Sequence, residues 1–240
     1  VSPEQLGSRR DAIAAELEFL LSAGERLLNL NTEIQAATAV WRTAAGKLAK
    51  TRTNAAKTLS KTTTALIAEL GMGGGRFEIA IEPNDAERAD PLGSERVEFL
   101  VSANAGQPPR ALRKVASGGE LSRISLAIEV AALGLDAVPT MVFDEVDSGI
   151  GGAVSDIVGR KLRALGEKRQ VLCVTHLPQV AAQGHAHYRV SKAPVDGMTQ
   201  SAVESLDAGQ REEELARMLG GVDVSKEARA AAKRLLSDVS

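Results

Sequence analysis

Residues 115–130 read VASGGELSRISLAIEV, a short loop that leads into a helix pattern. The loop ends at Ser117, Gly118 and Gly119, and apolar residues then recur at the spacing of one helix face. The first N–H groups of a helix have no partner within it, and the helix dipole is positive at that end. The stretch therefore predicts a helix N-terminus that faces an anion such as phosphate. The chain contains no G-x-x-x-x-G-K-[ST] loop to hold a nucleotide.

The composition is that of an ordinary globular chain. Of its 240 residues, 44% are hydrophobic and 25% charged, which allows one core and one appendage. The formal net charge of −2 gives no overall sign of nucleic-acid binding, so any such surface has to be local. The single cysteine, Cys173, excludes an intramolecular disulfide and suits a reducing, cytoplasmic environment. No apolar run approaches the roughly 18 residues of a membrane span, so we expect no membrane partner.

Residues 1–70 predict one long helical segment that is poor in aromatic residues. Apolar residues recur in it at alternating steps of four and three, which is the spacing of a coiled-coil seam. The seam residues are Leu30, Ile34, Ala37, Trp41, Ala44 and Leu48. At 1.5 Å per residue such a helix is on the order of 100 Å long, and nothing else in the chain is long enough to pair with it. The narrow seam favours one strand of an antiparallel coiled-coil arm over an amphipathic helix lying on the core.

Residues 71–240 have the pattern of a separate α/β domain. The glycines of GMGGG end the helix, and two alternating runs, residues 77–81 and 97–101, predict an antiparallel strand pair. The helix of the opening stretch follows. Two apolar segments, PTMVFDE and QVLCVTH, then predict buried strands on either side of a helix at about 154–165. The tail, residues 211–237, is rich in alanine and predicted to be helical.

Two adjacent acidic residues end the first of these apolar strands. In TMVFDEVDSGIGG the strand delivers Asp144 and Glu145 at its carboxyl end, where α/β sheets place their ligand sites. One carboxylate can hold Mg²⁺, and the other can orient or deprotonate an attacking water. The second strand ends in His176, a polar group able to contact a γ-phosphate. Because two strands of the same pattern end in these groups, we favour a phosphate site over polar residues that merely terminate strands.

Taken in order, these segments resemble the C-terminal lobe of an ABC-type ATPase head, and more narrowly the RecN family of the SMC-like group. The matching stretches are VASGGELSR for the signature motif, MVFDEVDSGIGG for Walker B and the D-loop, and CVTHLPQVAA for the H-loop. The hairpin before the signature and the closing RMLGG are also similar, so the resemblance spans essentially the whole chain. Transporter heads usually have glutamine after SGG, and other SMC-type heads usually have Ala-Leu-Asp at residues 148–150.

The resemblance implies a P-loop ATPase with ATP and Mg²⁺ as cofactors, and it implies a role for each matched residue. The signature residues would contact ATP held by an opposing head; they are Ser117, Gly118, Gly119 and Glu120. Asp144 would hold Mg²⁺, and Glu145 would be the catalytic base. His176 would sense the γ-phosphate, and Asp147 would couple the two sites.

The Walker A motif, the Q-loop and the outgoing arm of this family are absent from these 240 residues. The resemblance therefore implies a partner, the N-terminal half of the same protein, without which the chain should be inactive. The complete protein would be an ATPase of DNA double-strand break repair and recombination in the bacterial cytosol, associated with the nucleoid. ATP would join two heads as a homodimer, and the arms would clamp or bridge DNA.

Two other classes of function are the alternatives. The first is a nucleotide-binding domain of the transporter type, against which the long arm without a membrane-coupling surface argues. The second is a structural coiled-coil scaffold with an inactive head, against which the intact pair of Asp144 and Glu145 argues. ATPase activity after mixing with the N-terminal half would separate this second class from an enzyme.

The part of the predicted arm nearest the head carries positive charge on one side. There is no acidic residue between Glu33 and Glu69. Four lysines of this segment fall within roughly one quarter of the helix circumference, nearly opposite the seam. They are Lys47, Lys50, Lys57 and Lys61. A solvated lysine face explains the pattern as well as a sequence-independent contact with DNA, and the DNA contact is our hypothesis.

Two further polar groups carry no assigned role. Arg110, Arg113 and Lys114, just before the signature, fit either a solvated turn or a contact with an anion. His185 and His187 lack the second cysteine pair or the carboxylate spacing that a tetrahedral zinc site needs.

Overall fold

The computed structural model describes residues 3–84, 89–115, 117–133, 138–195, 198–221 and 223–239. The chain divides into two compact units. The arm unit comprises Val1–Asn54 with Ile81–Val97, and the core unit comprises Ala55–Ala80 with Glu98–Ser240. This division falls between Asn54 and Ala55, within the long N-terminal helix. The domain boundary predicted after residue 70 stays a prediction. None of the described helices is long and apolar enough to cross a membrane.

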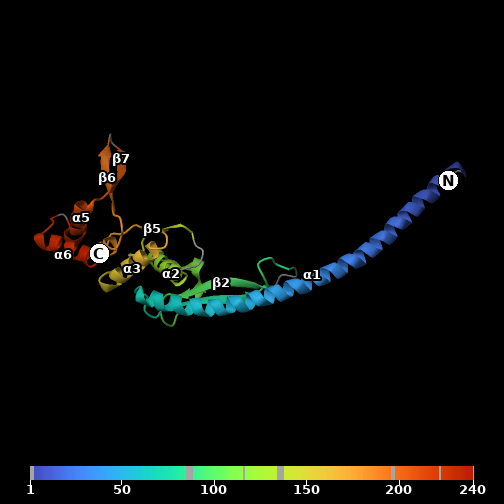
Figure 1. Ribbon diagram of the computed structural model, residues 1–240, viewed down its shortest axis with the longest axis horizontal. Helices are drawn as coiled ribbons and strands as arrows, with labels where there is room; N and C mark the ends of the chain where they lie inside the picture. The colour runs from blue at the N-terminus through green and yellow to red at the C-terminus, as the bar shows by residue number, and fades with distance from the viewer. Residues whose placement is uncertain are drawn as a thin grey trace. The chain divides into compact units, whose positions relative to one another are not determined.

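The longest element is α1 (Leu6–Glu69), a single helix of 64 residues that follows a short 3-10 turn, η1 (Pro3–Gln5), and is drawn from blue to cyan in Figure 1. It confirms the long helix predicted from the sequence. In the arm unit its apolar side chains remain largely in water: Leu17 is 56% and Leu28 is 71% exposed. An isolated helix gains little stability without burial of an apolar face, so this part of α1 has the surface of a helix that packs against another.

Within the arm unit, residues 89–97 lie against α1. The indole Nε1 of Trp41 donates a hydrogen bond of 2.9 Å to the carbonyl oxygen of Asp90, and Arg52 Nη1 lies 3.4 Å from Glu95 Oε2. Gly93 has φ +108°, and any side chain at this position would meet Arg52. The half-buried Trp41 is thus held by the connection between the first two strands rather than by another helix.

The first sheet consists of β1 (Arg76–Pro83), β2 (Glu95–Ser102) and β3 (Arg110–Ala111), in that order. The strands predicted at 77–81 and 97–101 are therefore present and adjacent. β2 and β3 are antiparallel, with Leu100 opposite Ala111. A 3-10 turn, η2 (Leu112–Lys114), follows β3.

The centre of the core unit alternates helices with two parallel strands. Its elements are α2 (Gly118–Ala131), β4 (Thr140–Phe143), α3 (Ala153–Gly166), β5 (Gln170–Cys173) and the short α4 (Pro178–Ala182). β4 and β5 pair in parallel, with Phe143 opposite Cys173. This arrangement confirms the predicted helix at about 154–165 and the α/β class. Because parallel strands end at the same edge, the residues that follow Phe143 and Cys173 lie next to each other.

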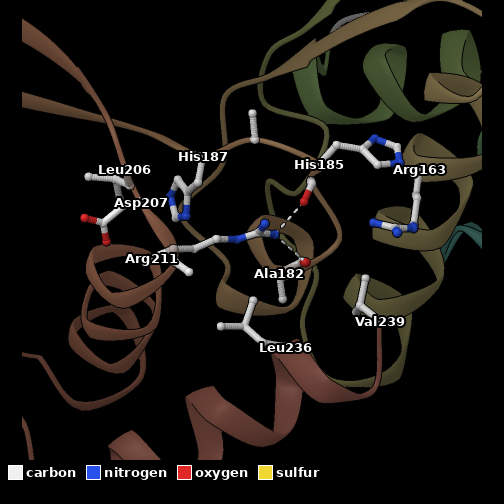
Figure 2. Close-up of a pocket in the computed structure, with 12 residues that line it drawn as sticks. Arg163, Ala182, His185, His187, Leu206, Asp207, Arg211, Leu236 and Val239 are labelled. Carbon is white, nitrogen blue, oxygen red and sulfur yellow. Dashed lines mark hydrogen bonds between the residues drawn. The ribbon is translucent and has the colours of Figure 1, made fainter.

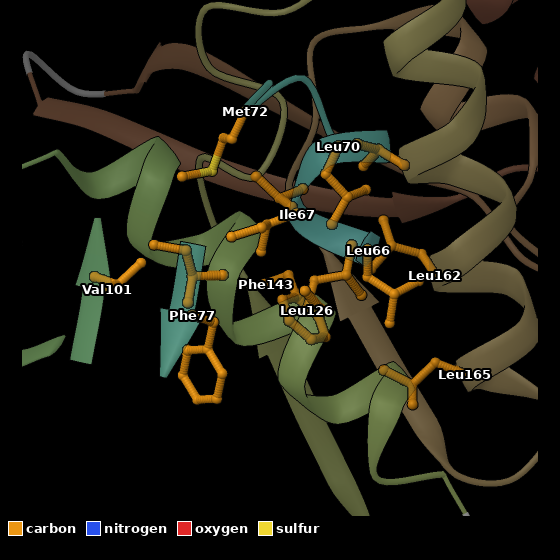
Figure 3. Packing of buried hydrophobic residues seen from close by; sticks show 14 of the residues in the cluster. Leu66, Ile67, Leu70, Met72, Phe77, Val101, Leu126, Phe143, Leu162 and Leu165 are labelled. Carbon is orange, nitrogen blue, oxygen red and sulfur yellow. The ribbon is translucent and has the colours of Figure 1, made fainter. Parts of the chain in front are cut away.

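The main core forms where the end of α1, the first sheet, α2, β4 and α3 meet (Figure 3). Its buried side chains are aliphatic except for two phenylalanines and one methionine. The largest fully buried ones include Ile67, Leu70, Phe77, Ile124, Leu126 and Leu165. The Phe77 ring meets that of Phe99 edge to face, with centroids 5.4 Å apart. The last turns of α1 are thus part of the core, which explains why the compact unit begins before the end of the helix.

The prediction that β4 and β5 are buried strands is wrong for one of their two faces. Phe143 is only 4% exposed, but its neighbour Val142 is 66% exposed. On β5 and just after it, Leu172 is 46% and Val174 is 62% exposed. The core unit covers one face of this strand pair and leaves the alternate side chains in water, because successive residues of a strand point to opposite faces.

The C-terminal part contains a hairpin that the sequence analysis missed. β6 (Tyr188–Val195) and β7 (Met198–Ser205) pair antiparallel and are drawn in orange in Figure 1. Two helices, α5 (Ala208–Gly220) and α6 (Lys226–Ser237), follow and confirm the helical tail. Asp207 and Gln210 form a capping box at the start of α5. A small second core joins these helices to the end of α4.

Candidate functional site

The signature stretch forms the N-terminus of α2, as predicted. Ser117 is the N-cap, and its side chain accepts a hydrogen bond from the backbone N–H of Glu120. Ser117 and Gly118 are exposed, whereas Gly119 is buried and Glu120 is half-buried. The start of the helix is thus accessible, and its role toward phosphate stays a prediction.

Gly118 and Gly119 let this helix end approach the loop after β4. A side chain on Gly118 would collide with the carboxylate of Glu145. One on Gly119 would come within 2.9 Å of the Ser148 Cβ and 3.2 Å of the Glu145 carbonyl oxygen. The structure therefore brings the signature glycines and Glu145 together within one chain, although the resemblance assigns them to opposite ATP sites. Glycine is required here for close approach rather than for an unusual φ.

Two side chains of α2 fasten it to the same loop. Ser122 Oγ donates a 2.6 Å hydrogen bond to the carbonyl oxygen of Asp144, and Arg123 Nη1 donates one of 2.7 Å to that of Ser148. Arg123 is only 7% exposed, and its burial lowers the pKa of the guanidinium, which Glu120 partly offsets. The sequence analysis missed Arg123. The only sequence feature that could have pointed to Arg123 is its position next to the apolar Ile124 on the predicted helix.

The two acidic residues follow β4 directly, and both are exposed. Asp144 Oδ1 accepts a 2.9 Å hydrogen bond from the backbone N–H of Glu145. Glu145 has φ +57°, a left-handed backbone conformation that is uncommon for a residue with a side chain and that concentrates at functional sites. The described residues contain no cluster of three or more potential metal ligands. Mg²⁺ usually takes one or two carboxylates and completes its shell with water and phosphate, so exposed Asp144 fits such an ion.

Asp147 and His176 meet beside the ends of β4 and β5. The carboxylate of Asp147, which is 2% exposed, accepts hydrogen bonds from the Thr175 hydroxyl and, at 3.0 Å, from the backbone N–H of His176. The same oxygen lies 3.3 Å from His176 Nδ1, while the histidine side chain stays 72% exposed. Asp147 thus joins the loop after β4 to the loop after β5. Its predicted role in coupling two ATP sites stays a prediction.

Cys173, at the end of β5, has an unreactive thiol. Burial raises the pKa of its thiol to about 12, and the negative charges of Asp147 and Asp144 contribute to the same shift. At neutral pH the thiol keeps its proton, and it is therefore a poor metal ligand and nucleophile.

The four lysines of the DNA hypothesis are all exposed on α1. Lys47 and Lys50 belong to the arm unit, and Lys57 and Lys61 to the core unit. Among the described residues none of them forms a salt bridge, which distinguishes them from Arg52. Among the basic residues just before the signature, Arg113 Nη2 lies 3.2 Å from Glu98 Oε1.

Comparisons with known proteins give relatives for almost the whole chain. No protein-family model matches it. It is 63% identical over 238 residues to the DNA repair protein RecN of Xylella fastidiosa (strain 9a5c), a match that covers 99% of this chain and 43% of the relative. It is 43% identical over 236 residues to the DNA repair protein RecN of Vibrio cholerae, covering 98% of this chain and 42% of the relative.

Among solved structures, the Smc head domain with a coiled coil and joint from Pyrococcus yayanosii aligns with 88% of this chain and 37% of that one. The TM-score is 0.49 and the identity 21%, and no functional conclusion rests on a likeness of that size. The two RecN relatives are far more similar in sequence, and the chain spans less than half the length of either one. The chain therefore belongs to the RecN family, of whose members it represents a part.

Proposed function

We propose that this chain supplies the C-terminal half of an ATPase head that works in DNA repair. One observation carries the proposal: the accessible start of α2 packs against the loop that holds Asp144 and Glu145, and His176 follows the neighbouring strand. A helix end for phosphate, a carboxylate for a metal, a base and a polar sensor are parts that phosphoryl transfer uses. The RecN relatives, which are named as DNA repair proteins, support the biological setting.

In this proposal the ligands are ATP and Mg²⁺, and bound Mg²⁺ would neutralise charge on the phosphates. Asp144 would hold the ion, since its carboxylate is exposed and only one of its oxygens accepts a hydrogen bond from the backbone. Glu145 would orient the attacking water and take its proton. The exposed start of α2, residues 117–120, would bind the phosphates of ATP carried by a second head.

His176 would contact the γ-phosphate through Nε2. Asp147 would be a positioning residue in this step, because its buried carboxylate holds both the backbone and Nδ1 of His176. The Asp147 carboxylate beside Nδ1 orients the imidazole ring, and because a phosphate oxygen is an acceptor, the contact through Nε2 would need a proton on that nitrogen as well. Movement of the loop after β4 would then reach His176 through Asp147.

The partners we propose are the N-terminal half of the protein, a second copy of the head, and DNA. The exposed apolar residues on α1 and on the open face of β4 and β5 support the first, because both surfaces need another segment to cover them. We place the complete protein in the bacterial cytosol, at the nucleoid. In this setting ATP would bring two heads together, and its hydrolysis would release them while the arms hold DNA.

The test of the head is Glu145→Gln in the complete protein. The amide cannot accept the proton of the water, so hydrolysis should fall by roughly 10²–10⁴-fold while ATP binding persists. Phosphate release and nucleotide binding are measured, with Glu167→Gln, an exposed acid at the end of α3, as the matched control. Normal turnover in Glu145→Gln would remove its assignment as the base. Absence of hydrolysis in the unmodified complete protein would instead favour an inactive scaffold.

Head joining is tested separately with Ser117→Arg. A large cation at the accessible start of α2 should block a second head. The change also removes the N-cap hydrogen bond to Glu120, which costs about 1 kcal/mol and leaves the buried core in place. ATP-dependent dimers, measured by sedimentation, should disappear. The control is Ser201→Arg on exposed β7. Unchanged dimers in Ser117→Arg would contradict a signature that binds ATP across the interface.

The DNA contact of the arm is tested by changing all four exposed lysines to glutamine. Each lysine that engages a phosphate contributes about 0.9 to the slope of log affinity against log salt, so the slope should flatten by up to about 3.6. The control changes four exposed lysines outside α1: Lys168, Lys192, Lys226 and Lys233. An unchanged salt slope with unchanged circular dichroism would make the lysines of α1 a solvated face.

A further inference from the structure

A cavity of about 460 Å³ lies in the core unit between α3, the loop after α4, α5 and α6. Its volume is within the usual range of small-molecule sites, roughly 300–1,000 Å³. One part of the lining is apolar and includes Leu206, Leu236 and Val239. The other part is basic, as Figure 2 shows, with Arg163, His185, His187 and Arg211 grouped around the space. No residue of the proposed ATP site lines this cavity.

Backbone carbonyls fix the two arginines at the cavity. Arg211 Nη2 donates to the carbonyl oxygens of Ala182, at 2.7 Å, and Gly184. Arg163 Nη1 donates to that of Gln183 at 2.9 Å. A single turn of backbone thus holds both guanidinium groups. Neither arginine side chain therefore loses much further conformational freedom when a ligand binds.

The charges of these two arginines are not paired with any described carboxylate. Among the described residues neither Arg163 nor Arg211 forms a salt bridge. The acid in the described lining is Asp207, whose carboxylate accepts a 2.8 Å hydrogen bond from Gln210 N as the cap of α5. The nearby Glu214 is paired with Arg217 at 2.6 Å. The cavity therefore has an excess of positive charge.

Two buried nitrogen atoms of the lining have no hydrogen-bond partner: Arg211 Nε and His187 Nδ1. Buried polar atoms are normally satisfied, so such atoms point to a missing ligand or water. The charges agree with this. Burial lowers the pKa of Arg211 and the charge of Arg163 lowers it further. Burial and the charge of Arg211 lower the pKa of His187, while Glu214 opposes the shift.

We propose that this cavity binds a phosphate group, held by the guanidinium groups of Arg163 and Arg211 and the imidazoles of His185 and His187. A phosphate dianion matches two guanidinium groups, and Nη1 of Arg211 and Nη2 of Arg163, which donate to none of these carbonyls, can donate to its oxygens. The group would come either from free inorganic phosphate or from a phosphate monoester, whose organic part the apolar side of the cavity would accommodate. The proposal does not depend on the ATPase function.

The test follows the imidazole NMR signals of the 240-residue chain, which has three histidines. The signals are assigned with His176→Gln, His185→Gln and His187→Gln. Sodium phosphate is titrated at constant pH and ionic strength against sodium chloride. The signals of His185 and His187 should shift and saturate with phosphate but not with chloride. Equal shifts in chloride would overturn the proposal.

Matched variants keep the test specific. Arg163→Gln should weaken phosphate binding by about tenfold or more, the effect of losing one charged contact. Arg160→Gln makes the same change on the exposed side of the same helix and should leave binding unchanged. Arg163→Lys keeps the charge and should retain part of the binding, which separates charge from packing. Equal binding in Arg163→Gln and Arg160→Gln would refute the assignment.

The source of the phosphate is resolved with two oligonucleotides of identical sequence, one with a 5′-phosphate and one with a 5′-hydroxyl. If only the phosphorylated oligonucleotide competes with inorganic phosphate, the cavity binds the 5′-phosphate of a strand end. Competition by neither, with saturable binding of inorganic phosphate, assigns it to free phosphate. Equal shifts of the His185 and His187 signals by both, without competition against phosphate, would contradict a phosphate-selective cavity.

Discussion

The two faces of the β4–β5 pair both carry apolar side chains but have opposite surroundings. On one face Phe143 and Cys173 contact the main core. On the other, Val142, Leu172 and Val174 are 66%, 46% and 62% exposed. Parallel strands are normally covered on both faces, because their crossovers place helices there. The difference teaches that an apolar pattern predicts a buried strand but does not say which segment covers each face. The core unit covers one face, and we propose that the N-terminal half covers the other.

The largest effect should come from truncation on the covered face. Phe143→Ala should lower the free energy of unfolding by about 3–5 kcal/mol, since it leaves a cavity in the core. Val142→Ala, one residue away on the open face, should change it by only about 0.5 kcal/mol. Urea denaturation of this chain measures both. Similar losses of unfolding free energy for the two variants would contradict the difference in burial between the two faces.

A charge on the open face should act only when the N-terminal half is present. Val174→Lys should leave the stability of this chain nearly unchanged, because the side chain is 62% exposed. It should weaken association with the N-terminal half by about tenfold or more, since an apolar interface would have to bury an unpaired ammonium group. Binding titrations measure this, with Val174→Thr as a milder control. Unimpaired association would mean that another surface meets that half.

An effect confined to alkaline pH concerns Cys173 on the covered face. Its folded pKa of about 12 lies above the unfolded value, so above roughly pH 9 the unfolded thiol loses its proton first. Stability should therefore fall as pH rises, by up to about 1.4 kcal/mol per pH unit between the two pKa values. Cys173→Ala should lose this part of the pH dependence. Identical slopes in both proteins, measured by denaturation between these limits, would show that the thiol ionises as readily folded as unfolded.

The sequence predicted most elements of the core because each has a local signal. The helix of α2 shows its cap at Ser117, and β4 and β5 show apolar runs that end in Asp144 and His176. The hairpin of β6 and β7 was missed although its sequence carries an Asp-Gly turn signal, because exposed strands such as this one lack a strong apolar pattern.

The arrangement of the candidate site could be predicted only in part. Strand ends placed Asp144, Glu145 and His176 at one edge. The burial of Asp147 and the buried Arg123 could not be foreseen, since both depend on which loops meet in space. Local sequence also gave no sign of the positive φ of Glu145, because glycine usually marks such positions.

The hydrogen bond between Trp41 and Asp90 gives the arm unit its own spectroscopic signal. Trp41 is the only tryptophan of the chain, and it is half-buried against the connection between β1 and β2. Intrinsic fluorescence excited in the indole band therefore reports on the arm unit alone. The red shift of the tryptophan emission during denaturation gives the denaturant concentration at which that contact is lost. Far-ultraviolet circular dichroism follows the helices of both units. A gap between the two midpoints would measure how independently the two units unfold.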